Sequence, residues 1–171
     1  MGARKLLEGD IDLITAHIKS GIAAALASIR ADRADALVTT EPPPTGSYFN
    51  YPKAIGYRTP AVFVVGDSMA FQQESGPNFI KAISNVNVTV LIEDRTAERL
   101  VIKAYRYMCA LHELLEQTTL VTADEKLKIV CKVTRAENSP LYSTSEDESA
   151  VENVFRKEVS LFLDVEHWEN F

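Results

Sequence analysis

The sequence has only two cysteines, Cys109 and Cys131, and its seven glycines are scattered along 171 residues. Two cysteines, each inside an apolar pattern, are too few for a disulfide framework or a zinc site, so we expect two reduced, buried thiols. The separate glycines form no loop that could cradle a phosphate group. We therefore predict no metal site and no bound cofactor.

Long hydrophobic runs are also missing. None approaches the roughly 18 to 20 apolar residues that a membrane-spanning helix needs. The first residues, MGARKLLE, become acidic before an apolar signal core develops, so we predict neither an export signal nor a membrane partner. The 46% hydrophobic and 25% charged residues are typical of a globular domain, and we expect one domain over residues 1–171.

A basic face, which proteins that grip nucleic acid need to neutralise phosphates, is not evident either. The net charge is −6, and residues 136–171 hold nine acids against Arg156 and Lys157, so the rest of the chain is close to neutral. We expect no specific DNA binding. Glu146, Asp147 and Glu148 are adjacent acids in a stretch, 137–151, that is predicted to be a mobile acidic loop outside the sheet.

The first half of the chain predicts a long helix followed by an extended arm. Apolar residues recur at steps of three and four over 10–36, which indicates an amphipathic helix with Ile14, Ile18 and Ile22 on its buried stripe. Three successive prolines, Pro42 to Pro44, end this periodicity and favour an extended conformation. Residues 39–60 are therefore predicted to be an arm that folds back on its own domain or docks on a partner, and the core is expected to lie outside it.

Residues 61–171 predict a sheet with a central helix over 96–117. The run 61–65 is typical of a buried strand, and alternating apolar residues predict further strands over 86–92, 127–133 and 159–165. The predicted fold class is α+β, with helices packed on one face of a mainly antiparallel sheet of four to five strands.

The sharpest chemical motif is Gly66-Asp67-Ser68-Met69, which follows the first predicted strand. It resembles the SGNH esterases, in which a serine pairs with a late Asp-x-x-His, here Asp164 and His167, although no Gly-x-Asn-Asp segment is present. It also resembles LexA-type self-cleaving proteases, but the candidate base, Lys103, falls in a helical pattern. A plain Gly-Asp turn explains the same residues. A small serine hydrolase is therefore kept as the alternative function, and we expect no catalytic site.

A second motif places His112 and Glu116 one helical turn apart, as in part of a zinc-binding helix. The other histidines, His17 and His167, lie in unrelated elements, so an exposed helix edge is the favoured interpretation.

The order of elements resembles the tail terminator (tail-completion or neck) proteins of tailed bacteriophages. The resemblance covers the N-terminal helix, the crossing segment 57–60 into the strand 61–65, the strand 86–90, the helix 97–117 and the closing strands that end at Val165. It implies a virion structural protein, made in the host cytoplasm, that forms a commonly six-fold ring on the tail tube. The implied partners are further copies of itself, the tail tube protein and a head–tail connector, with genomic DNA passing through the ring without specific binding.

A closed ring needs two different contact patches on each subunit, which an arm and a charged loop would suit. Another head–tail connector, or a monomeric adaptor that binds a peptide through the arm, remains an alternative. The candidate interface residues are Pro42, Pro43, Pro44, Tyr48, Phe49, Tyr51, Glu146, Asp147 and Glu148.

Overall fold

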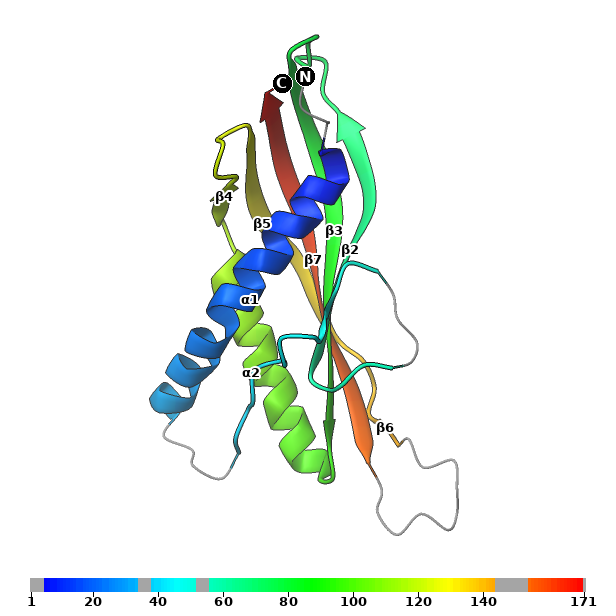
Figure 1. Ribbon diagram of the computed structural model, residues 1–171. Helices are drawn as coiled ribbons and strands as arrows, with labels where there is room; N and C mark the ends of the chain where they lie inside the picture. The colour runs from blue at the N-terminus through cyan, green and yellow to red at the C-terminus, as the bar shows by residue number, and fades with distance from the viewer. Residues whose placement is uncertain (1–4, 34–37, 52–55, 144–153, 171) are drawn as a thin grey trace.

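The computed structural model describes residues 5–33, 38–51, 56–143 and 154–170 (Figure 1). These residues form an α+β fold in which two helices pack on one sheet. The elements in chain order are α1 (Leu6–Arg33), β1 (Tyr48–Phe49), β2 (Ala61–Phe71), β3 (Phe79–Asp94), α2 (Ala97–Leu115), β4 (Thr119–Val121), β5 (Leu127–Asn138), β6 (Tyr142–Ser143) and β7 (Phe155–Asn170).

The strands form one sheet in the order β1-β2-β3-β7-β5-β4, with β6 pairing with the start of β7. All neighbouring strands are antiparallel except β1 and β2. The central strands β3 and β7 pair along their whole length, from Phe79 opposite Asn170 to Asp94 opposite Phe155. The prediction of a mainly antiparallel sheet is confirmed.

The predicted strand number was wrong, because the described residues hold seven strands rather than four or five. The additional strands β1, β4 and β6 have two or three residues each, which is too short for an alternating pattern to be visible in the sequence. Tyr142 and Ser143 were assigned to the acidic loop but pair with β7. The long strands also extend well beyond the predicted runs.

Both helices lie on the same face of the sheet (Figure 1). The predicted stripe of α1 is buried, and alternate residues of the long strands face it because successive side chains of a strand point to opposite faces. α1 and α2 approach closely at Gly21, where a Cβ atom would lie 2.6 Å from Leu114 Cδ2. Within the described residues, no helix has the length and apolarity needed to cross a membrane.

β2 continues through the Gly66-Asp67-Ser68 motif, so the predicted Gly-Asp turn was wrong. The register between β2 and β3 shifts between Gly66 and Ser68, which makes Asp67 the extra residue of a β-bulge. The glycine is needed for packing: a Cβ atom at Gly66 would lie 2.7 Å from Leu7 Cγ in the first turn of α1.

Candidate functional site

The three residues of the hydrolase hypothesis do not meet. Ser68 is opposite Asn85, and Asn85 is opposite Asp164, so these side chains share the sheet face that the helices leave open. Asn85 Nδ2 donates a hydrogen bond to the Ser68 hydroxyl at 2.9 Å. His167 lies three positions beyond Asp164 on β7, an odd number, so its imidazole points to the opposite face. The SGNH-type triad of Ser68, Asp164 and His167 is therefore contradicted by the register of the sheet.

His167 belongs instead to a buried polar cluster beneath α1. Its Nδ1 atom lies 2.6 Å from Asp10 Oδ1, and the Ser84 hydroxyl donates to Asp10 Oδ2 at 2.6 Å. The Glu169 carboxylate accepts hydrogen bonds from the backbone amides of Lys5 and Leu6 at the start of α1, and its Oε2 lies 3.5 Å from His167 Nε2. The cluster ties the start of α1 to β3 and β7.

The position of this cluster suits it for structure rather than catalysis. Asp10, Ser84 and His167 are fully buried, so no substrate reaches them. Cys131 lies in the same layer, where burial and then the charge of Asp10 raise the pKa of its thiol to about 12. The thiol is therefore protonated, which makes it a poor nucleophile.

Lys103, the base of the second hydrolase hypothesis, is engaged elsewhere. Its Nζ atom lies 2.6 Å from Asp94 Oδ2 at the end of β3. Burial alone would raise the pKa of Asp94, but the hydrogen bond and charge of Lys103 and the Thr96 amide hold it below the ordinary value. Asp94 is nine residues along β3 from Asn85, the partner of Ser68, which is roughly 30 Å in a strand. Lys103 does not approach Ser68.

The partial zinc motif has no third ligand among the described residues, where no group of three or more His, Cys, Asp or Glu side chains is placed to hold a metal ion. Glu116 accepts a hydrogen bond from the Val133 amide at 2.8 Å, so it holds the edge of β5. The two thiols are free, as expected, but Cys109 is exposed rather than buried because it lies on the outer side of α2.

The arm packs on its own domain, which is the first of the two predicted alternatives. The Ser47 hydroxyl donates to the Arg58 carbonyl at 2.8 Å, and the Val62 amide donates to the Ser47 carbonyl at 2.8 Å. Arg106 and Tyr107 of α2 donate hydrogen bonds to the carbonyls of Val38 and Glu41. Polar backbone groups of the arm find partners against the domain, which is why it folds back. Among the three prolines, Pro43 is buried, whereas Pro42 and Pro44 are exposed.

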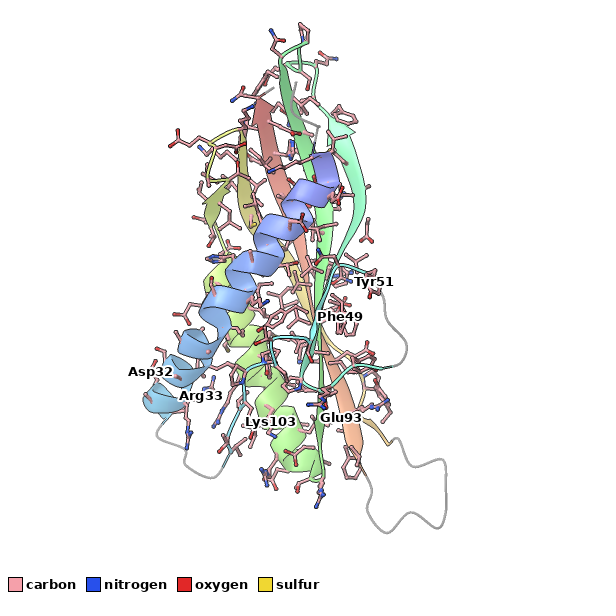
Figure 2. All side chains as sticks on the ribbon, in the orientation of Figure 1. Asp32, Arg33, Phe49, Tyr51, Glu93 and Lys103 are labelled. Atoms are coloured by element: carbon pink, nitrogen blue, oxygen red, sulfur yellow. The ribbon has the colours of Figure 1, made fainter. Side chains whose placement is uncertain are left out.

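The aromatic residues after the prolines divide between the two faces of the sheet. Tyr48 lies opposite Val62 and packs against the core, whereas Phe49 lies opposite Phe63 on the open face. Phe49 stacks on Phe63 at 5.4 Å between ring centroids and meets Tyr51 edge-on at 6.1 Å. Figure 2 shows the labelled side chains of Phe49 and Tyr51 near each other, and Tyr51 is 57% exposed. The remaining interface candidates, Glu146, Asp147 and Glu148, lie outside the described residues.

Two hollows lie away from these residues. A shallow groove of about 660 Å³ on the open face is lined by Phe79, Trp168 and Lys128, with Lys128 Nζ 5.5 Å from the Trp168 ring centroid. A polar cavity of about 90 Å³ lies between Glu41, Glu93 and Lys103, the last two of which are labelled in Figure 2. The Glu93 carboxylate in this cavity already accepts a hydrogen bond from the Thr59 hydroxyl and forms an ion pair with Arg156. Neither hollow gathers an arrangement of catalytic groups.

Sequence reasoning missed two exposed strand segments. We call residues 67–71 the free end of β2 and residues 134–138 the free end of β5. Phe71, in the first, is 59% exposed. Ala136, in the second, is exposed although its partner Leu161 is buried in the core. These segments contain mainly polar or small residues. A weak continuation of the alternation between apolar and polar residues was the only sequence signal that the strands are longer than predicted.

No protein-family model matches this sequence, and no curated protein matches it. Among solved structures, a chain described as "Virion of native gene transfer agent (GTA) particle" is similar over 87% of this chain and 94% of that chain. The similarity has a TM-score of 0.41 and 15% sequence identity.

Proposed function

We propose that this chain is a structural virion protein of the tail terminator type, which forms a ring at the end of a tail tube, stops tube growth and offers the surface for head attachment. The element order behind the sequence resemblance is present in the fold: α1, the crossing into β2, the central α2 and the closing strands β5 and β7. A subunit of this kind acts through its surfaces rather than through an active site.

One observation carries the proposal. Among the described residues, both helices cover the same face of the sheet and none covers the other, and the sheet has exposed free ends at its two opposite edges, on β2 and β5. A subunit of a closed ring needs two different patches that complement each other, and two opposite edges of one sheet are such patches.

The polar residues considered for catalysis support the same conclusion, because each one has another partner within the fold. Ser68 accepts from Asn85, His167 contacts Asp10, and Lys103 pairs with Asp94. In the proposed ring the partners are further copies of the chain, the tail tube protein and a connector protein. The acid surplus disfavours adhesion of the DNA that passes through.

Negative-stain imaging of the concentrated full chain, alone and with tube ends, tests the proposal. We expect rings of uniform diameter, and antibody labelling of particles is expected at the neck. A chain that stays monomeric under every condition, tube ends included, contradicts the proposed function.

The hydrolase alternative requires a reactive Ser68, whereas the structural role does not. We expect no hydrolysis of short acyl esters and no labelling of Ser68 by serine-directed phosphonates. The reason is that the described residues place the Asn85 amide, which is no base, at hydrogen-bond distance from the Ser68 hydroxyl, while His167 and Lys103 lie elsewhere. Ser68→Ala serves as the matched control in both assays. Stoichiometric labelling that Ser68→Ala abolishes would overturn the structural role.

A further inference from the structure

We infer that neighbouring copies of this chain join through their two free strand ends, with the free end of β2 of one copy pairing with the free end of β5 of the next. The inference rests on the proposed function, because it names the contact that would build the ring. It goes beyond that function by placing the interface on two short strand segments.

Neither free end has a partner strand within the described part of the chain. β1 covers only Val62 and Phe63 of β2, and β4 covers only residues 128–130 of β5. Beyond β4, two backbone amides of β5 that point away from β7 still find partners within the chain. The Cys131 amide donates to the Thr118 carbonyl, and the Val133 amide donates to the Glu116 carboxylate. The open part of β5 therefore begins after Val133. An exposed strand edge of this kind is a template for pairing with another chain.

The backbone amides at the centres of both free ends point outward. The Gln72 amide donates to Lys81 of β3, so by the alternation of an antiparallel pair the amides of Phe71 and Met69 point away from β3. The Ser139 amide donates to Glu158 of β7, so by the same alternation the Ala136 amide points away from β7. Met69 and Ala136 thus offer hydrogen-bonding groups to a new strand, as in β-strand addition.

A second copy fits these edges better than an unrelated strand does. β2, β3, β7 and β5 are successively antiparallel, so β2 and β5 run in opposite directions. Copies placed side by side in one orientation therefore bring the two edges together as an antiparallel pair. The contact is head-to-tail, which is the kind that generates rings. Charge does not choose the partner, because Arg135 in the free end of β5 already pairs with Glu137 of the same segment at 3.0 Å, so the match rests on the direction and position of the two edges.

The displacement of the two free ends matches a closed ring. Met69 is opposite Ser84 of β3, which is opposite Val165 of β7. Ala136 is opposite Leu161, so the two free ends are displaced by four residues along β7. Four residues of strand measure about 13 Å, and four strand spacings from one β2 to the next measure about 19 Å. Aligning the free ends therefore tilts the strands about 35° from the ring axis, within the range of closed barrels.

Disulfide trapping tests the contact directly. In a Cys109→Ser background we combine Met69→Cys with Ala136→Cys, two positions on the same sheet face that would lie opposite each other across the interface. Mild oxidation is expected to give a ladder of covalently linked copies on non-reducing gels. Met69→Cys combined with Tyr105→Cys, an exposed position on α2, is the matched control and is expected to give no ladder.

Proline substitutions test the backbone pairing. Met69→Pro and Ala136→Pro each remove one outward amide, which an edge strand tolerates. We expect each to weaken association roughly tenfold or more, whereas Met69→Ala and Ala136→Ser leave association unchanged. Circular dichroism of each variant checks the fold, and the cysteine pair decides the matter where a proline variant unfolds.

The outcomes separate this inference from the proposed function. Suppose that the wild type forms rings, that both proline variants form the same rings, and that the Met69→Cys, Ala136→Cys pair gives no ladder. The inferred contact is then wrong, whereas the proposed ring stands. Open filaments that do give the ladder support the contact and overturn the ring. Monomers that give no ladder at any concentration, with tube ends present as well as absent, overturn both.

Discussion

At the residue scale, Asp10, His167 and Glu169 form a cluster of polar groups buried in the core. Charged groups removed from water are tolerated only when paired and hydrogen-bonded, and removing one partner leaves the others uncompensated. Asp10 contacts both His167 and Ser84. It is therefore the residue on which the cluster depends.

We predict that Asp10→Ala lowers the free energy of unfolding by about 3–5 kcal/mol, the typical cost of breaking a buried pair. Urea denaturation monitored by circular dichroism measures the change. Glu166→Gln is the matched control, because Glu166 is an exposed acid on the other face of β7 and is expected to change stability little. A loss as small as that of the control would show that the cluster does not stabilise the fold.

The two cysteines are predicted to differ in reactivity. Cys109 is exposed, whereas Cys131 is fully buried with its thiol pKa raised to about 12. Near neutral pH we expect iodoacetamide to modify Cys109 and to leave Cys131 unmodified until the chain is unfolded, because the thiolate is the reacting form. Peptide mass spectrometry before and after addition of urea provides the measurement. Equal modification in the folded state would contradict the burial of Cys131.

This cluster was not predicted from the sequence, and its residues show why. Asp10 and His167 are 157 positions apart, so no local pattern links them. The available signal lay in β7, where polar His167 and Glu169 continue the inward positions that Leu163 and Val165 occupy before them. A polar residue at an inward position needs a buried partner, but the sequence does not say which.

At the element scale, the arm is part of its own domain. The Glu41 carbonyl of the arm accepts a hydrogen bond from Tyr107 of α2, the carbonyl of Val38 just before the arm accepts one from Arg106, and Val38 and Ser47 are buried. The residues between α1 and β2 therefore help to hold the helix layer in place. Among the described residues, the buried hydrophobic side chains of the core all lie outside residues 39–60, as expected, and Tyr48 of the arm packs against them.

Replacing Pro42-Pro43-Pro44 by Gly-Ser-Gly is predicted to destabilise the chain by about 1–3 kcal/mol, because each rigid proline lowers the entropy of the unfolded chain. Thermal and urea denaturation measure the loss. Replacing Gln72 and Gln73, exposed or half-exposed residues between β2 and β3, by Gly and Ser is the control for a flexible surface substitution. Unchanged stability of the arm variant would mean that the arm is held loosely.

The helices and central strands were predictable because each has a strong period. The helix predicted over 10–36 is Leu6–Arg33, and that predicted over 96–117 is Ala97–Leu115. The outer parts of β2 and β5 were not predictable, because Asp67, Ala70 and Ala136 give no apolar alternation. The strands there are held by pairing with long central neighbours rather than by burial of their own side chains.

At the scale of the whole molecule, one sheet carries two different surfaces. The covered face holds the core and the buried cluster, whereas the open face holds Ser68, Asp164 and the aromatic residues beside Phe63. Within the described part of the chain the helices cover only one face, so the other face and the free ends of β2 and β5 are open for contacts. Assembly of copies would use these surfaces without rearranging the core.

The charge of Glu146, Asp147 and Glu148, rather than their shape, is proposed to matter in assembly. Replacing the three acids by Gln, Asn and Gln is predicted to leave the melting temperature almost unchanged, because a polar, acidic stretch has little apolar surface to bury. Tail completion or head joining is expected to fall, and the defect to depend on salt, since charges are screened over roughly 8–10 Å at physiological ionic strength. Complementation of tail assembly at several salt concentrations measures the size of the defect.

Replacing Glu125, an exposed acid in the turn between β4 and β5, by Gln is the control. If the triple variant assembles fully at every salt concentration, the three acids only keep the connection between β6 and β7 solvated.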